Sequence, residues 1–147
     1  MKLSAETIAR FDREVAKYPA DQKQSAVMAC LAIVQHEQGY VSQVAEAAIA
    51  AHLGMPPIAV HEVTTFYNMY NQQPVGQWKL NVCTNLPCAL RNGESALGHL
   101  CSKLGVEPYG TTADGVFTVQ PSDEIAGVAL AGGVMLGGSL IGSTVMG

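Results

Sequence analysis

Two cysteines five positions apart are the sharpest chemical feature of this sequence. They bound the segment Cys83-Thr84-Asn85-Leu86-Pro87-Cys88. The alternation of apolar and polar residues from Trp78 to Val82 predicts a half-buried strand before this segment, and a helix is predicted after it. Two thiols in such a loop can face one point, where soft thiolates suit an iron–sulfur cluster or zinc. On spacing and placement alone, two unrelated small core residues remain the alternative.

The other two cysteines and the four histidines have no regular spacing relative to this loop. Cys30 and Cys101 fall on apolar faces of predicted helices, so we interpret both as small buried residues. Cys101 also lies roughly 15–20 Å along a helix from Cys88, at about 1.5 Å per residue, which is too far to share one site. The four histidines have no common spacing; they are His36, His52, His61 and His99.

The composition narrows the classes of function. The chain has 147 residues, eight Lys and Arg against twelve Asp and Glu, and a net charge of -4. Such a chain offers no basic surface for nucleic acid, so we expect no nucleic-acid partner. The charged start MKLSAETIARFDREV has no apolar run, so no signal peptide is expected. In a reducing cytosol, paired cysteines more often serve metal or redox chemistry than a structural bridge.

Residues 1–75 predict a bundle of four helices with short connections. Ser4, Asp21 and Ser42 are suited to cap the first three helices, because their side-chain oxygens accept hydrogen bonds from a first turn. The proline pair at 56–57 is tolerated in the first turn of a fourth helix. The predicted ends are Pro19, Gly39 and Gly54.

Helical spacing also predicts which side chains these helices bury. The predicted buried sets are Val27, Cys30, Leu31 and Val34 in the second helix, Val44, Ala47, Ala48 and Ala51 in the third, and Ile58, Val63, Phe66 and Met69 in the fourth.

Residues 76–124 predict a small α/β unit. After the cysteine loop, a helix is expected from about Leu90, with its end at Gly105. The turn signal Ala113-Asp114-Gly115 then opens a short strand from Val116 to Val119. The order of strand, cysteine loop, helix and strand is the beginning of an α/β domain.

Residues 18 to 118 resemble the thioredoxin-like [2Fe-2S] ferredoxin family that provides the small E subunit of NADH:quinone oxidoreductase (respiratory complex I), with relatives in NAD-linked hydrogenases and formate dehydrogenases. The matching stretches are YPADQKQSAVMACLAIVQHEQGYVS, LGMPPIAVHEVTTFYNMYNQQPVG, VCTNLPCALRNG and TTADGVFTV. The resemblance implies an α+β fold, in which the helical bundle precedes a thioredoxin-like α/β ferredoxin domain that is incomplete at its C-terminus. It also implies electron transfer through a [2Fe-2S] cluster beside a partner subunit that carries FMN and binds NADH. The implied location is cytoplasmic, peripheral to the inner membrane as part of the complex.

The resemblance also exposes a departure from the family pattern. The family's cluster takes a C-x4-C pair, matched by Cys83 and Cys88, and a later C-x3-C pair. Counting forward places the second pair near Glu124 and Val128, where the sequence has no cysteine. Carboxylate from Glu124 is a poor match for a soft site. A thioredoxin-like dithiol protein, or a structural subunit without a cluster, therefore remains an alternative.

Residues 125–147 form a different kind of segment. They carry no charge and hold seven of the fifteen glycines. The segment is long enough to cross a bilayer but is poor in large apolar residues. A membrane helix, a divergent continuation of the ferredoxin domain with a strand such as Val134 to Leu136, and a replaced tail all remain open. A truncated domain would leave a sheet edge exposed.

Overall fold

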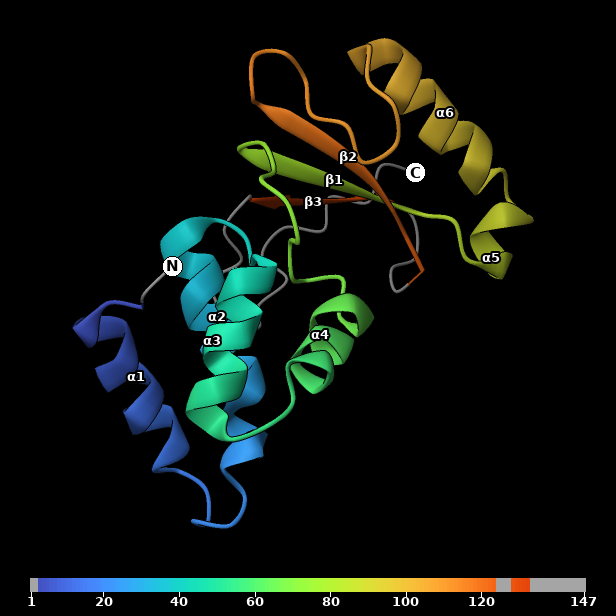
Figure 1. The fold of residues 1–147 in the computed structure, drawn as a ribbon. Helices are drawn as coiled ribbons and strands as arrows, with labels where there is room; N and C mark the ends of the chain where they lie inside the picture. Colours follow the sequence, from blue (N-terminus) through green and yellow to red (C-terminus); the bar gives the residue numbers. More distant parts are fainter. Residues whose placement is uncertain (1–2, 124–127, 133–147) are drawn as a thin grey trace. The chain divides into compact units, whose positions relative to one another are not determined.

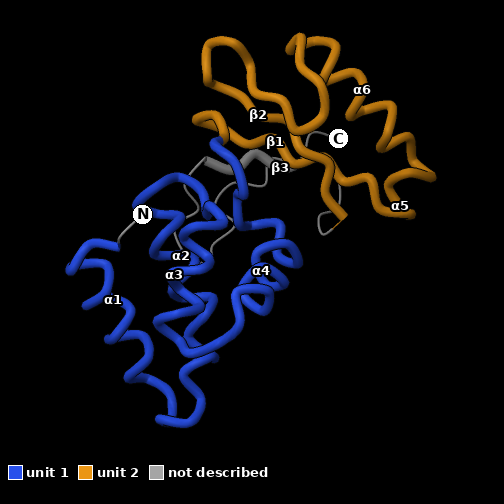
Figure 2. The backbone as a smooth tube through the Cα atoms, in the orientation of Figure 1, with its two compact units in different colours: residues 1–74 blue, residues 75–147 orange. Residues whose placement is uncertain are grey.

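The computed structural model describes residues 3–123 and 128–132, in two compact units. Residues 1–74 form one unit and residues 75–147 the other (Figure 2). The predicted strand at Val134 to Leu136 lies outside the described residues. Within the described part of the chain, no helix is long and apolar enough to cross a membrane.

The first unit consists of helices (Figure 1). Ser4 caps α1 as predicted, since its Oγ accepts a hydrogen bond from Thr7 N at 3.0 Å. Ser42 caps α3 in the same way, with Ala45 N as the donor at 3.2 Å. The helices are α1 (Ala5–Val15), the 3-10 helix η1 (Lys23–Ala26), α2 (Val27–Gln38), α3 (Gln43–Leu53) and α4 (Pro57–Phe66).

Two predicted ends are confirmed and one predicted cap is wrong. Gly39 and Gly54 follow α2 and α3 with φ of 80° and 67°, the left-handed conformation that glycine adopts at little cost. Asp21 caps no helix, because the chain first forms η1 and α2 begins only at Val27. A 3-10 turn thus occupies the place of the predicted first turn.

The buried face of α2 is as predicted, but those of α3 and α4 are not. Val44 is 52% exposed, while Ile49 and Leu53 are buried on another face of α3. The predicted stripe consisted mostly of alanines, and the larger Ile49 and Leu53 gain more from burial. In α4 the buried residues are Val60 and Thr64. The predicted Ile58 and Phe66 are 63% and 72% exposed, whereas the predicted Val63 and Met69 are partly buried against the core, with Met69 beyond the end of the helix.

The second unit is a three-stranded sheet with helices beside it, within the residues described. Its elements are β1 (Trp78–Cys83), α5 (Leu86–Ala89), α6 (Gly93–Leu104), β2 (Phe117–Ser122) and β3 (Val128–Gly132). The strand order is β2-β1-β3, so β1 is central. β1 runs parallel to β2, with Cys83 opposite Ser122, and antiparallel to β3, with Val82 opposite Val128.

Helix α6 packs on the sheet through its apolar residues (Figure 1). Cys101 is buried there with Val82 of β1 and Val119 of β2, and Leu97, Leu100 and Leu104 pack against them. The predicted end at Gly105 is confirmed. The helix begins at Gly93 rather than about Leu90, because the short α5 intervenes.

Candidate functional site

The two cysteines of the loop occupy the end of β1 and the helix α5. Cys83 is 3% exposed, Cys88 is half-buried, and both are free thiols. Asn85 turns the chain between them, since its Oδ1 accepts a hydrogen bond from Leu86 N at 2.7 Å. Its backbone carbonyl accepts another from Cys88 N at 2.8 Å. The structure therefore places both predicted residues in one short, internally bonded loop.

Gly93 fixes the other side of this loop. A Cβ atom at Gly93 would stand 2.7 Å from the carbonyl oxygen of Cys83 and 2.9 Å from that of Cys88. The two cysteine carbonyls thus converge on the first residue of α6, in space that no side chain can enter. The sequence analysis missed Gly93, although the Asn92-Gly93 dipeptide is a turn signal. Asn92 indeed adopts a left-handed φ of 66°.

The end of β2 is hydrogen-bonded to the cysteine loop. Thr84 N donates to Ser122 O at 2.9 Å, and Asn85 Nδ2 donates to Asp123 O at 2.9 Å. On the far side of residues 124–127, Val128 pairs with Val82, the neighbour of Cys83. Both ends of the segment in which the resemblance places a second cysteine pair therefore adjoin the first pair.

The remaining cysteines are buried residues of the two cores, as predicted. Cys30 is fully buried in α2, and burial, with the charge of Glu14 as a smaller cause, raises the pKa of its thiol to about 12. Burial and the charge of Glu107 also raise the pKa of the Cys101 thiol. Because thiolates are the metal ligands, both groups are poorly suited to bind a metal.

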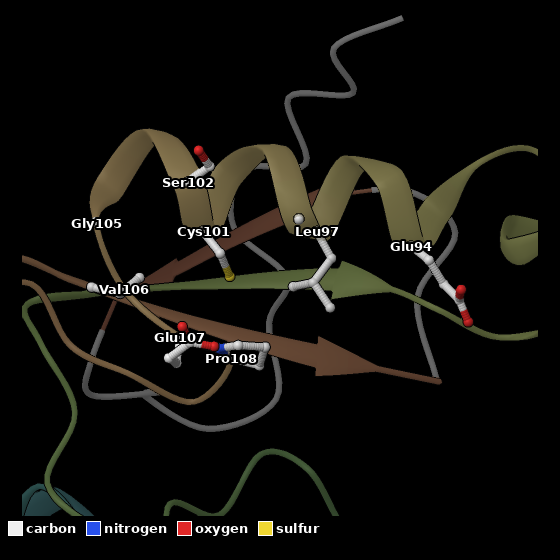
Figure 3. Close-up of a pocket in the computed structure, with 9 residues that line it drawn as sticks. Glu94, Leu97, Cys101, Ser102, Gly105, Val106, Glu107 and Pro108 are labelled. Carbon is white, nitrogen blue, oxygen red and sulfur yellow. The ribbon is translucent and has the colours of Figure 1, made fainter.

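A cavity of about 550 Å³ lies along α6, and it involves neither loop cysteine. Leu97, Cys101 and Val106 form its apolar lining, with Glu94 and Glu107 also beside it (Figure 3). Both carboxylates are on exposed residues. The residues that line this cavity therefore include neither Cys83 nor Cys88 of the candidate site.

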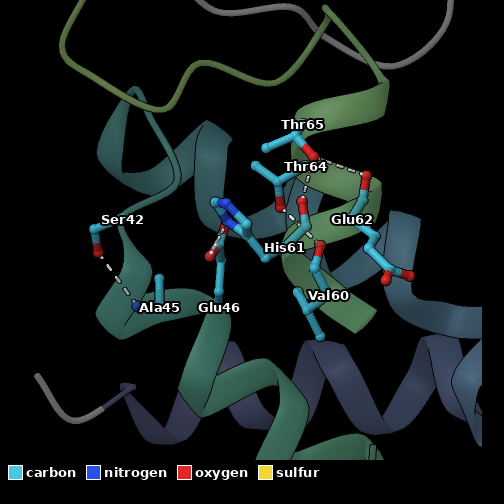
Figure 4. A network of polar contacts seen from close by, with 8 residues as sticks. All are labelled: Ser42, Ala45, Glu46, Val60, His61, Glu62, Thr64 and Thr65. Atoms are coloured by element: carbon cyan, nitrogen blue, oxygen red, sulfur yellow. Dashed lines mark hydrogen bonds and ion pairs between the residues drawn. The ribbon is translucent and has the colours of Figure 1, made fainter. Parts of the chain in front are cut away.

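Two histidines join helices of the first unit. Figure 4 shows His61 of α4 turned toward Glu46 of α3, with Nδ1 2.9 Å from Oε2. His52 Nε2 lies 3.2 Å from Asp12 Oδ1 of α1. No group of three or more His, Cys, Asp or Glu side chains in the described ranges is arranged to hold a metal ion.

The mixed fold, with one cysteine at the end of the central strand and the other in the short helix that follows, is typical of a ferredoxin-like class of protein. The chain belongs to the thioredoxin-like [2Fe-2S] ferredoxin family, whose sequence profile matches residues 11–144. The match extends over residues of both units, and the predicted mixed fold of helices and a sheet is confirmed.

Curated relatives of this chain are subunits of NADH-quinone oxidoreductases. It is 36% identical over 104 residues to the second E-type subunit of the enzyme from Rhizobium meliloti, covering 71% of this chain and 61% of the relative. It is 37% identical over 105 residues to NADH-quinone oxidoreductase subunit 2 of Thermus thermophilus, covering 71% and 58%. The chain thus spans about three fifths of the length of these relatives. A solved NAD+-reducing [NiFe]-hydrogenase chain is similar over 66% of this chain and 16% of its own, with 18% identity and a TM-score of 0.47.

The donor set of this chain fits half of a [2Fe-2S] site. Such clusters are held by four cysteine thiolates. The loop supplies Cys83 and Cys88 next to the end of β2, but residues 122–147 contain no cysteine. The other two thiols are buried in α2 and α6. One chain of this sequence therefore does not complete the ligand set.

Proposed function

We propose that this chain is an electron-transfer subunit of an NADH:quinone oxidoreductase, or descends from one, and docks beside a flavin-bearing subunit. The observation that carries the proposal is the cysteine loop that the resemblance singles out, which is held by contacts of its own: the backbone carbonyls of Cys83 and Cys88 converge on Gly93, and the Asn85 side chain binds the loop to Asp123. The identity of 36% to an NADH-quinone oxidoreductase subunit, over 71% of this chain, supports the same assignment.

In this proposal FMN and NADH belong to the partner subunit. The chain contributes Cys83 and Cys88 as two thiolates of a [2Fe-2S] site. Its location is cytoplasmic, peripheral to the inner membrane through the complex. The redox chemistry would belong to the cofactors, while the chain would supply ligands and burial.

We also propose a division into a helical bundle of residues 1–75, a thioredoxin-like domain of residues 76–124 and a divergent tail of residues 125–147, with the domain incomplete at its C-terminus. The change from helices to the β1–β2 sheet near residue 75 supports the first boundary. Residues 128–132 of the tail supply β3, so the sheet extends into it.

Affinity purification of the tagged full chain from its native host tests the proposed complex. We expect a flavin-containing, NADH-oxidising subunit to be recovered with it, and not with a tag-only control. Recovery of the folded chain without such a subunit would overturn the proposal.

A thiol–disulfide protein is the second candidate, favoured by the convergence of both cysteine backbones on Gly93 and the missing second pair. Its chemistry would be exchange of the Cys83–Cys88 dithiol with a disulfide substrate. The spacing is not C-x-x-C, and residues 84–87 include no basic side chain that could stabilise a thiolate. Reduction of insulin by the purified protein, lost in Cys88→Ser, would support this candidate.

A further inference from the structure

The cavity beside α6 is large enough to hold a small organic molecule. Its volume is about 550 Å³, and sites for such molecules usually measure about 300–1,000 Å³. Two glycines keep part of the lining open, since a Cβ atom at Gly98 or at Gly105 would meet nothing within 4 Å. The lining comes from α6 and from the residues directly after it, so the whole site belongs to one short stretch of the second unit.

The charged side chains of the lining all carry the same sign. They are the carboxylates of Glu94 and Glu107, and both residues are exposed. Lys103, the basic residue in the last turn of α6, is not part of the lining. It lies about 200° around the helix from Cys101, at about 100° per residue. The cavity therefore favours a ligand with positive charge.

The two carboxylates stand toward opposite ends of an apolar strip. Glu94 and Cys101 lie on the same side of α6, two turns and about 10 Å apart along its axis. Glu107 is near Cys101, since burial and then the charge of Glu107 raise the pKa of that thiol. Figure 3 shows Leu97 and Cys101 turned into the cavity, with Glu94 at one end of this row and Glu107 nearer to Cys101. Apolar side chains thus separate two negative charges.

We propose that this cavity binds a linear aliphatic diamine or polyamine, with one ammonium group at Glu94, another at Glu107 and the methylene chain along Leu97 and Cys101. The length of such a ligand suits the lining, because an extended chain of seven methylenes holds its two terminal nitrogens about 10 Å apart. The site uses neither cysteine of the loop, so this proposal does not depend on the proposed electron transfer.

Neither the charges nor the apolar strip would be enough alone. Each ion pair with an exposed carboxylate contributes little, because water screens it. Transfer of methylene groups from water onto Leu97, Cys101 and Val106 adds a favourable contribution that grows with the length of the chain. Binding should therefore require two ammonium groups joined by a chain long enough to reach both glutamates.

The test is titration of the isotope-labelled full chain with heptane-1,7-diamine, followed through its backbone amide signals by NMR. We expect saturable shifts at Leu97, Cys101 and Val106. The affinity should be about two- to five-fold higher than that for heptan-1-amine, which lacks one ammonium group. It should be about ten-fold or more above that for propane-1,3-diamine, which is too short to reach both carboxylates. The absence of saturable shifts at these residues, or an equal affinity for propane-1,3-diamine or magnesium ions, would overturn the proposal.

Variants separate this site from a general attraction between the acidic chain and a cation. Glu94→Gln and Glu107→Gln change exposed residues, so the fold should remain, and each should weaken the binding of heptane-1,7-diamine by about two- to five-fold. Glu62→Gln removes the same charge from an exposed position of α4 and should leave the affinity unchanged. Gly98→Leu places a side chain in the open space and should lower the affinity by about ten-fold or more. Wild-type affinity in the Glu94 and Glu107 variants, or in Gly98→Leu, would contradict the proposal.

Discussion

Asn85 and Asp123 connect the cysteine loop to the end of β2. The Asn85 side chain donates from Nδ2 to the Asp123 carbonyl oxygen at 2.9 Å, while its Oδ1 caps α5 at Leu86 N. The Asn85 amide thus holds both the turn between the cysteines and the start of the segment in which the family places its second cysteine pair. A carboxylate at position 85 could still accept the bond from Leu86 N but could not donate to Asp123, and a methyl group could make neither bond.

This relationship predicts graded effects at position 85. Asn85→Ala should lower the free energy of unfolding by about 1–2 kcal/mol, through loss of the cap and the tie to Asp123. Asn85→Asp keeps an acceptor for Leu86 N but loses the donor, so its free energy of unfolding should fall by about half as much. Urea unfolding measures both variants. Equal stability of Asn85→Ala and the wild type would contradict the role given to this side chain.

Gly93 and Gly98 make a matched pair in α6. A Cβ at Gly93 would collide with the carbonyl oxygens of Cys83 and Cys88, so Gly93→Ala should cost about 1–3 kcal/mol by forcing the loop to shift. A Cβ at Gly98 meets nothing within 4 Å, and Gly98→Ala should stabilise the helix by roughly 0.5–1 kcal/mol. Urea unfolding of both variants is the check, and effects of the same sign would be inconsistent with the structure.

Most local caps were predictable from the sequence, with Asp21 the exception, whereas the burial of helix faces was less so. The confirmed caps contact backbone groups within four residues, so the local sequence is enough to predict them; they are Ser4, Ser42, Gly39 and Gly54. The face of α3 depends on which helices surround it, and an alanine-rich helix gives a weak pattern.

In the candidate site, too, local features could be predicted from the sequence, whereas tertiary contacts could not. The position of Cys83 and Cys88 around a turn followed from local spacing. The Asn92-Gly93 turn signal lies only five residues after Cys88, but it does not say which carbonyls approach Gly93, and that contact was missed. The pairing of Val128 with Val82 joins segments distant in the chain, for which single-sequence patterns carry no direct signal.

Lys79 of β1 gives a pH dependence of stability. Burial lowers its pKa to about 8, against about 10.4 for an unfolded lysine. The unfolded chain therefore binds more protons between these values, and this group makes stability rise with pH from about 8 to 10. The Cys30 thiol has the opposite sign, because burial raises its pKa to about 12.

A comparison with Lys79→Met isolates the lysine, since Cys30 titrates in both proteins. The variant should be more stable than the wild type at pH 7, by up to about 3 kcal/mol, and the difference should shrink toward pH 10.5. Urea midpoints at several pH values measure it. A difference that is constant or grows with pH would contradict the burial of a charged Lys79.

The four thiols should differ in reactivity. Cys88 is half-buried, whereas Cys30 and Cys101 are buried with raised pKa values, and the thiolate is the reactive form. With iodoacetamide under native conditions, Cys88 should be alkylated at least ten-fold faster than either buried thiol. Peptide mass spectrometry gives the rates, with the urea-unfolded chain as the control. Labelling of Cys30 as fast as Cys88 would show that the first unit is not packed as described.

Iron counting with low-temperature EPR, after anaerobic reconstitution with iron and sulfide, tests most directly whether Cys83 and Cys88 are the ligands. We expect a labile [2Fe-2S] signal on reduction, with iron below two per chain. Cys83→Ser should abolish the bound iron, while Cys101→Ser should change it little. Two irons per monomer, stable in air and unaffected by Cys83→Ser, would contradict the account.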